Sequence, residues 1–149
     1  MPPHTTQVPR IDPRYACFSI LLRKSPIHRY GVYAGEPIPA RRKVIEYTGE
    51  LISRKETRRR GLGPRTYLFT LNSYWTVDGS VGGSGAEYIN HSCEPNLRSW
   101  ILKNHILYMS KREIAAGEEL TVDYKFARDV GEVRCQCGSS TCRGTINLR

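Results

Sequence analysis

Three cysteines near the end of this 149-residue chain stand close enough together to bind a metal: Cys135, Cys137 and Cys142. Structural zinc in proteins is held by four thiolate or imidazole ligands in tetrahedral geometry. Cys135 and Cys137 are too close in sequence to form a disulfide with each other easily. We therefore expect one structural zinc ion, with Cys93 as the best candidate for the missing fourth ligand. The alternative is four thiols that bind no metal.

A second group of reactive residue types lies upstream of this cluster. Asn90-His91-Ser92-Cys93 comes first, and the stretch 117–124 ends at Tyr124. If Cys93 shares one metal with the tail, the tail is fixed beside Asn90 and His91, and metal binding contributes to its folding. The residues alone thus predict a zinc-organised pocket that contains a tyrosine.

Short strands have to position these residues. Runs rich in β-branched, aromatic and aliphatic residues, separated by Gly, Pro and Asn, predict strands at 17–22, 43–47, 66–71, 74–78, 99–102, 105–110 and 120–124. Asn72-Ser73 and Lys103-Asn104 are predicted as two-residue hairpin turns. One helix is expected, with Ser53 as its N-cap, Glu56 completing a capping box and Gly61 at its end. The predicted fold is mostly β, in several small sheets.

Length and composition indicate one domain with no membrane span, since no run of about 18 apolar residues occurs. The Pro-, Thr- and Arg-rich start is unlike a signal peptide and is expected to be a flexible arm. Without a secretory signal, five cysteines argue against a disulfide framework. Cys17, in the apolar run 16–22, is expected to be a small buried hydrophobe; a reactive thiol is the alternative.

The chain is strongly basic, with a formal net charge of +9. Such a surface suits an anionic partner, most often nucleic acid, and the alternative is an ordinary solvated surface. The segment 54–60 concentrates the positive charge. It is expected either to contact phosphate or to face water.

Several segments, taken in order, resemble the SET-domain protein lysine methyltransferases that have a zinc-binding post-SET tail. The matching segments are residues 25–34, 46–50, 67–69, 77–79, 89–96 and 117–124, followed by the tail cysteines. The Ser25-Pro26-Ile27-His28 start is most similar to the trithorax type. The resemblance implies a SET fold whose C-terminal segment threads through a loop in a pseudoknot-like arrangement. It also implies an arm at 1–14, a SET domain at 15–128 and a post-SET tail at 129–149.

The resemblance also implies roles for individual residues, with S-adenosylmethionine as the methyl donor. Its implied binding residues are His28, Tyr30, Tyr67, Asn90, His91 and Gln136, and the implied zinc ligands are Cys93, Cys135, Cys137 and Cys142. Tyr124 matches the catalytic tyrosine, and Tyr47 and Tyr67 match tyrosines that line a lysine channel. One departure is Arg29, where the family usually has the first glycine of Gly-x-Gly; this bears on how closely the backbone approaches the donor.

A second departure concerns the number of methyl groups added. Two residues before the catalytic tyrosine the family has Phe or Tyr, which sets the room in the channel, whereas this chain has Val122. The smaller side chain favours dimethyl or trimethyl product. The alternative is that another aromatic residue, such as Tyr47 or Tyr74, fills the space.

Taken together, these features predict a monomeric, S-adenosylmethionine-dependent protein lysine methyltransferase that acts on a histone or another basic tail. One alternative is a catalytically silent SET module that binds chromatin or a lysine-bearing tail. Another is a small basic zinc protein that binds nucleic acid without a cofactor. We expect an intracellular location: nucleus and chromatin in a eukaryote, with the cytoplasm or secretion as an effector in a bacterium.

Overall fold

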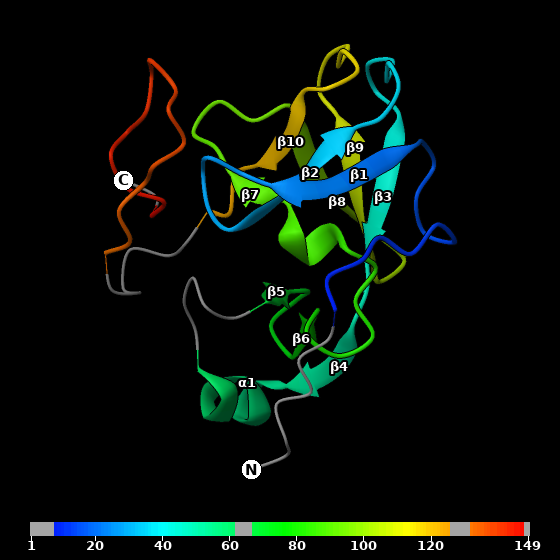
Figure 1. Cartoon of the computed structure of the whole chain (residues 1–149). Helices are drawn as coiled ribbons and strands as arrows, with labels where there is room; N and C mark the ends of the chain where they lie inside the picture. Colours follow the sequence, from blue (N-terminus) through cyan, green and yellow to red (C-terminus); the bar gives the residue numbers. More distant parts are fainter. Residues whose placement is uncertain (1–7, 62–66, 126–131, 148–149) are drawn as a thin grey trace.

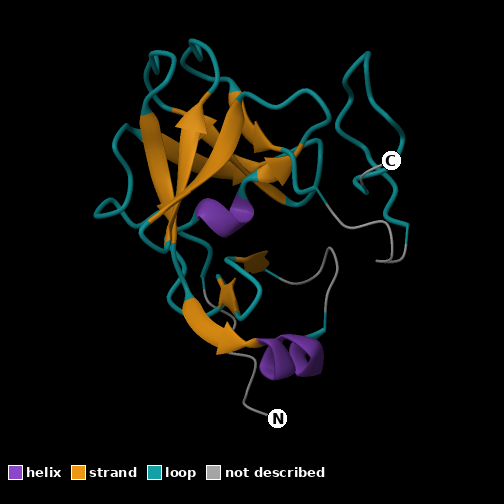
Figure 2. Cartoon of the chain, turned by 180° about the vertical axis from the view of Figure 1, so that it is seen from behind, coloured by secondary structure: helices purple, strands orange, loops and turns teal. Residues whose placement is uncertain are grey.

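The computed structural model describes residues 8–61, 67–125 and 132–147, and strands dominate it as predicted (Figures 1 and 2). The strands are β1 (Ile20–Lys24), β2 (Tyr30–Ala34), β3 (Lys43–Tyr47), β4 (Glu50–Ser53), β5 (Leu68–Thr70), β6 (Trp75–Asp78), β7 (Asn90–His91), β8 (Leu97–Leu102), β9 (His105–Ser110) and β10 (Glu119–Val122). The helical elements are α1 (Arg54–Arg60) and the 3-10 turn η1 (Ala86–Tyr88). None of these helices is long and apolar enough to cross a membrane.

The strands form three small sheets, which agrees with the predicted fold class. Their orders are β1-β2-β10-β7, β3-β9-β8 and β4-β6-β5. In the first sheet β10 lies between β2, to which it is antiparallel, and β7, to which it is parallel. The segment that ends at Tyr124 is therefore held between two strands from much earlier in the chain. This central position is what the predicted threading requires.

A single apolar core joins the sheets. Val32 of β2, Ile45 of β3 and Leu120 of β10 are completely buried. Val44 and Thr121, their neighbours on β3 and β10, are buried as well, so both faces of these strands are covered. The core thus sets the direction of the side chains near β7 and the end of β10.

The predicted helix is confirmed in detail, because its signals are local. The Ser53 hydroxyl accepts the Glu56 N–H at 3.2 Å, and Gly61 follows the last turn with a φ of +82°. Arg60 then ties α1 to the third sheet through Glu50 (2.9 Å) and Asp78 (2.7 Å). The basic helix is consequently docked by one arginine, while Arg54, Lys55, Arg58 and Arg59 are exposed.

One hairpin turn is as predicted and the other is wider. Lys103 and Asn104 join β8 to β9 with φ values of +49° and +65°, which is the backbone of a tight two-residue turn. The predicted Asn72-Ser73 turn is wrong: the Asn72 side chain accepts the N–H groups of Tyr74 and Trp75, which lengthens the loop.

Two further predictions need correction. The predicted strand at 17–22 begins at Ile20, and Cys17 is exposed instead of buried. The reason is that the Cys17 N–H bonds to the Val44 carbonyl in a loop across β3, so the strand alternation does not extend to it. Strands β2, β4 and β7 were not predicted at all, since they are short and contain Gly or polar residues.

The start of the described chain packs against the glycine-rich loop before η1. The Asp12 N–H donates to the Ser84 carbonyl at 2.8 Å, and Asp12 is only 7% exposed. A Cβ on Gly85 would lie 2.6 Å from the Ile11 side chain, so this contact requires glycine. Residues 8–14 of the predicted arm are therefore partly attached to the domain, and residues 1–7 lie outside the described part.

Candidate active site and metal centre

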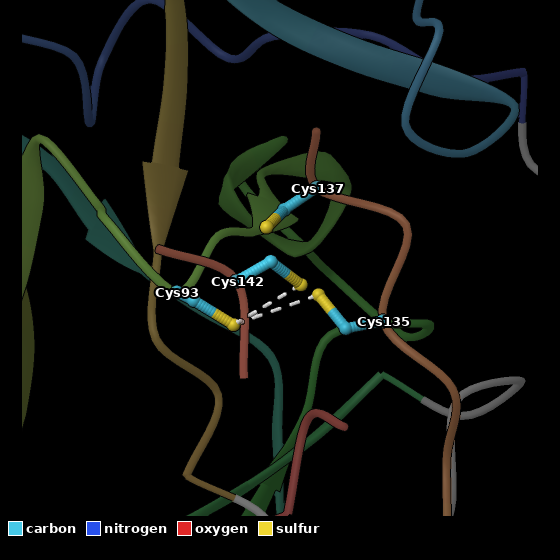
Figure 3. A group of neighbouring side chains, drawn as sticks. All are labelled: Cys93, Cys135, Cys137 and Cys142. Carbon is cyan, nitrogen blue, oxygen red and sulfur yellow. Dashed lines mark hydrogen bonds between the residues drawn. The ribbon is translucent and has the colours of Figure 1, made fainter. Parts of the chain in front are cut away.

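The four predicted zinc ligands converge on one point (Figure 3). The sulfur atoms of Cys93, Cys135, Cys137 and Cys142 all lie within 4.8 Å of one another. The Cys93 sulfur is 3.7 Å from that of Cys135 and 3.9 Å from that of Cys142. A tetrahedral zinc–thiolate site, with bonds of about 2.3 Å, places its sulfurs about 3.8 Å apart. The four thiols thus have the number, the type and the spacing that zinc requires.

Main-chain amides around the thiols favour their ionised form. The Arg143 N–H points at the Cys93 sulfur (3.5 Å) and the Gly144 N–H at the Cys142 sulfur (3.4 Å). For Cys137, burial opposes ionisation, but amide hydrogen bonds from Cys93 and Ser139, together with the thiols of Cys135 and Cys142, outweigh it and lower the pKa of this thiol to about 6. For Cys93 and Cys135, burial dominates and raises the pKa. Thiolate is the form that binds metal, so the site is suited to a cation.

A salt bridge adds a second connection between the tail and the sheets. The Arg143 guanidinium binds both carboxylate oxygens of Asp123, at 2.9 and 3.0 Å, and also the carbonyls of Ile146 and Asn147. Such a two-pronged pair fixes orientation as well as distance. Since Asp123 directly precedes Tyr124, the tail is attached at the predicted catalytic residue.

Asn90 joins the first sheet to the segment that precedes β2. Its buried amide group donates to the carbonyls of His28 (3.3 Å) and Tyr30 (2.8 Å) and to the Glu119 carboxylate (3.0 Å). The Ser25 hydroxyl donates to the same carboxylate at 2.8 Å. Three predicted donor-site residues are thereby brought together, with Glu119 between them.

Arg29 and Gly31 show how the backbone passes this point. Arg29 has a φ of +36°, a backbone conformation that glycine adopts more readily than other residues. Gly31 has no room for a side chain, because a Cβ there would lie 2.5 Å from a Glu119 oxygen. The main chain therefore passes close to the Glu119 carboxylate at Gly31.

His91 and Tyr124 are also adjacent, with their ring centroids 5.5 Å apart. The Tyr124 N–H donates to His91 Nδ1 at 3.1 Å, and the Tyr124 hydroxyl donates to the Ile89 carbonyl at 2.5 Å. Burial is the main cause that lowers the pKa of His91 to about 4. Burial also raises the pKa of the Tyr124 hydroxyl, which therefore stays protonated at neutral pH.

The predicted channel residues form an aromatic cluster next to Tyr124. The Tyr47 hydroxyl donates to the Tyr67 carbonyl at 2.5 Å, and the Tyr47 ring packs on Phe69 (5.3 Å) and Tyr108 (6.1 Å). Burial raises the pKa of Tyr47, of Tyr67 and of Tyr108. The cluster therefore presents neutral hydroxyl groups and no strong base.

The remaining predicted residues are more exposed. His28 and Gln136 are exposed, and Tyr30 is 43% exposed. Tyr74 is 75% exposed in its turn, away from the buried cluster, so it does not fill the space beside Val122. Tyr47 packs against Phe69 and Tyr108, not against Tyr74.

Comparison with known proteins agrees with this geometry. Residues 29–125 match the SET domain family model. The chain belongs to the SET-domain family. A solved structure described as KRYPTONITE in complex with mCHG DNA and SAH (S-adenosylhomocysteine) has the same fold, with a TM-score of 0.77 and 27% identity over 88% of this chain and 29% of that one.

Curated relatives of this SET domain are much longer proteins. The H3 lysine-4 specific histone-lysine N-methyltransferase of Yarrowia lipolytica is 41% identical, across 83% of this chain and 12% of its own length. Histone-lysine N-methyltransferase trithorax of Drosophila virilis is 40% identical, across 83% of this chain and 4% of its own length. The chain thus spans only a small part of the relatives that it matches.

Sequence reasoning missed several residues of the SET-domain site. The sequence analysis assigned no role to Glu119, Tyr108 or Arg143. Glu87 is the most unusual of the missed residues, since it is 9% exposed and its carboxylate accepts the Gly85 N–H. Close packing of Gly83, where a Cβ would meet the Glu87 carboxylate, could have been suspected from the glycine-rich loop 79–85.

We predict that purified protein contains one zinc ion per chain. Cys142→Ser should remove most of it, because three thiolates bind zinc much more weakly than four. Cys17→Ser is the matched control, since Cys17 is exposed and lies apart from the cluster, and it should leave the metal content unchanged. Elemental analysis decides the question, and metal-free wild-type protein would refute the assignment.

We predict that Glu87 makes the fold less stable as pH rises. Burial raises the pKa of Glu87 from 4.5 to about 7, against a smaller opposing effect of the Gly85 amide. The folded chain then binds more protons than the unfolded chain between these values, so the free energy of unfolding falls as pH rises through this window. The loss is up to about 3 kcal/mol, and Glu87→Gln should abolish it.

The measurement is urea unfolding of wild type and Glu87→Gln from pH 4.5 to pH 8. Glutamine keeps an oxygen for the Gly85 N–H, and at the acid end both side chains are uncharged, which provides the internal control. The variant should gain stability relative to wild type as pH rises. A constant difference across the range would mean that Glu87 is not held in its neutral form.

Proposed function

We propose that this chain is the catalytic SET domain of an S-adenosylmethionine-dependent protein lysine N-methyltransferase. The observation that supports it most is that Asn90, His91 and Tyr124 meet beside the four-cysteine cluster. The similarity to histone-lysine methyltransferases across 83% of the chain supports the same activity. We further propose the division into an arm at 1–14, a SET domain at 15–128 and a tail at 129–149; residues 128 and 129, at the last boundary, lie outside the described part.

Donor binding is proposed for His28, Tyr30, Tyr67, Asn90, His91 and Gln136. With its amide nitrogen committed to two carbonyls and Glu119, Asn90 has its oxygen left as the acceptor for an ammonium group. The face of Tyr67 suits a sulfonium cation. Gln136 lies between two metal-ligand cysteines, so the tail contributes one wall of the pocket only when the metal holds it in place.

The proposed reaction mainly requires that the lysine amine, the methyl group and the sulfur of the donor are aligned. Bound S-adenosylmethionine supplies an activated methyl group, so the difficult chemistry belongs to the cosubstrate. The substrate lysine has to be neutral, which costs about 4.6 kcal/mol at pH 7 from an ordinary pKa of 10.4. An apolar channel walled by Tyr47 and Tyr67 disfavours the ammonium form. The Tyr124 hydroxyl, fixed by the Ile89 carbonyl, orients the amine.

The substrate class follows from the relatives. We propose a histone tail, with histone H3 as the first candidate because four of the relatives are named H3 lysine-4 specific. Nuclear chromatin is the corresponding location in a eukaryote. The exposed basic residues of α1, namely Arg54, Lys55, Arg58 and Arg59, are candidates for contact with nucleosomal DNA. We propose that the chain acts as a monomer.

The test is transfer of a labelled methyl group onto nucleosomes, free histones and arrayed lysine peptides. The proposal requires label on a lysine of at least one protein substrate. A chain that binds S-adenosylhomocysteine but labels nothing would favour the alternative, a silent SET module that binds a lysine-bearing tail. No cosubstrate binding at all would favour a zinc protein that binds nucleic acid.

We predict that Tyr124→Phe keeps S-adenosylhomocysteine affinity within a few-fold but lowers turnover by about a hundredfold or more. An orienting hydroxyl acts mainly in the transition state, so its removal affects kcat more than binding. Steady-state kinetics and calorimetry measure the two effects separately. Tyr74→Phe is the matched control, because Tyr74 is 75% exposed and lies away from the buried aromatic cluster. A Tyr124 variant with near wild-type turnover would show that another group aligns the amine.

We also predict multiple methylation. Val122 is buried at 3% exposure and cannot hydrogen-bond a water that would block a second transfer. Mass spectrometry of a substrate peptide at long reaction time should show more than one added methyl group. Val122→Tyr should shift the product towards monomethyl-lysine. A wild-type product that stops at one methyl group would instead indicate that Tyr108 fills the available space.

A further inference from the structure

His91 lies between the metal cluster and the main chain of the proposed catalytic tyrosine. Its Nδ1 accepts the Tyr124 N–H at 3.1 Å, and its Nε2 is 3.5 Å from the Cys93 sulfur. The ring is 3% exposed, so water does not compete for either contact. One imidazole therefore bridges the Cys93 sulfur and the main chain of Tyr124. The proposed role of Asn90 and His91 in donor binding does not explain this bridge.

The position of the ring hydrogen follows from geometry. A main-chain amide can only donate, so Nδ1, which faces the Tyr124 N–H at 3.1 Å, has no hydrogen. The Asp123 carboxylate is farther from Nδ1, at 3.5 Å, and is bound by Arg143. The neutral imidazole then carries its hydrogen on Nε2, which faces the Cys93 sulfur. A thiolate bound to zinc still carries negative charge and accepts such a hydrogen bond. The same ring thus donates to the metal site and accepts from residue 124.

We propose that His91 is a positioning residue that couples the metal centre to Tyr124, so that the bound metal helps set where the catalytic hydroxyl lies. The second connection, from Arg143 to Asp123, acts on the neighbouring residue. Strand pairing supports the coupling as well, because Val122 of β10 is in register with His91 of β7. The part that concerns catalysis rests on the proposed methyltransferase function; the parts that concern the metal and the Tyr124 amide do not.

Two substitutions separate the two contacts. In His91→Asn the short side chain places its oxygen near the position of Nδ1, where it can accept the Tyr124 N–H, but it does not reach Cys93. In His91→Gln the longer side chain can place its NH2 group near the position of Nε2, where it can donate to Cys93, but it leaves Tyr124 without its acceptor. His91→Ala removes both contacts. The matched controls are His105→Asn and His105→Gln, at a histidine whose side chain is 62% exposed.

Three measurements apply to each variant: zinc affinity by competition with a chelator, hydrogen exchange of the Tyr124 amide by NMR in zinc-saturated protein, and turnover. His91→Asn should weaken zinc binding by about 10- to 100-fold, as loss of a hydrogen bond to a metal ligand does. It should also lower turnover, because the ring no longer links Cys93 to Tyr124, while exchange of the Tyr124 amide stays near wild type. His91→Gln should keep zinc affinity within a few-fold but speed exchange on the order of tenfold and lower turnover. His91→Ala should show both defects.

The outcomes are distinct. If the asparagine and glutamine variants resemble alanine in all three measurements, His91 is a packing residue and the coupling is wrong. If all three variants resemble wild type, it is also wrong. If wild-type protein transfers no methyl group, the proposed function fails, while zinc affinity and amide exchange still decide whether His91 links the two sites.

Discussion

The rest of the site depends on one constraint: four thiols from distant parts of the sequence converge within 4.8 Å of one another, where they could hold a single metal ion. Cys93 follows β7, and the other three cysteines lie in residues 135–142. The described tail, 132–147, has one isolated bridge between Arg134 and Thr145 and no strand of a sheet. A metal bound by the four thiols would therefore supply much of the free energy that holds the tail in place.

The sheets and the C-terminal tail contribute differently to the site. The sheets, with Val32 and Leu120 completely buried, give a rigid platform for Asn90 and for the end of β10. The tail adds residues on a side of the site that the sheets alone would leave open to water. It is anchored by Cys93 and by the Arg143–Asp123 pair. In the proposed methyl transfer, alignment of the amine with the donor would tolerate little positional error. Anchoring the tail within two residues of His91 and Tyr124 would limit that error.

Structural features that depend on residues close together in the sequence could be predicted from it. Ser53 and Glu56 predict the helix because capping involves residues three apart, and Lys103-Asn104 predicts its turn because both residues tolerate a positive φ. The cysteine cluster was also predictable, since three of its four members are close in sequence. Motif order then supplied Asn90, His91 and Tyr124, which the structure brings together.

Structural features that depend on contacts between distant segments could not be predicted from the sequence. Cys17 has apolar neighbours yet lies in a loop, and β7 is recognisable only because β10 pairs with it. Glu119 could not be distinguished from Glu118 before the fold placed its carboxylate against the Asn90 amide. Glu87 likewise looked like a surface residue until the glycine-rich loop was seen to cover it. Such roles arise from contacts between segments tens of residues apart.

Calorimetric titration with S-adenosylhomocysteine, with and without zinc, tests the central claim most directly. The protein is compared before and after chelation, with circular dichroism to verify that the sheets persist. The account predicts one binding site in the zinc-loaded chain and an affinity at least about a hundredfold lower in the stripped chain, restored by adding zinc back. Equal affinity in the two forms would contradict it, because the pocket would then exist without the metal-held tail.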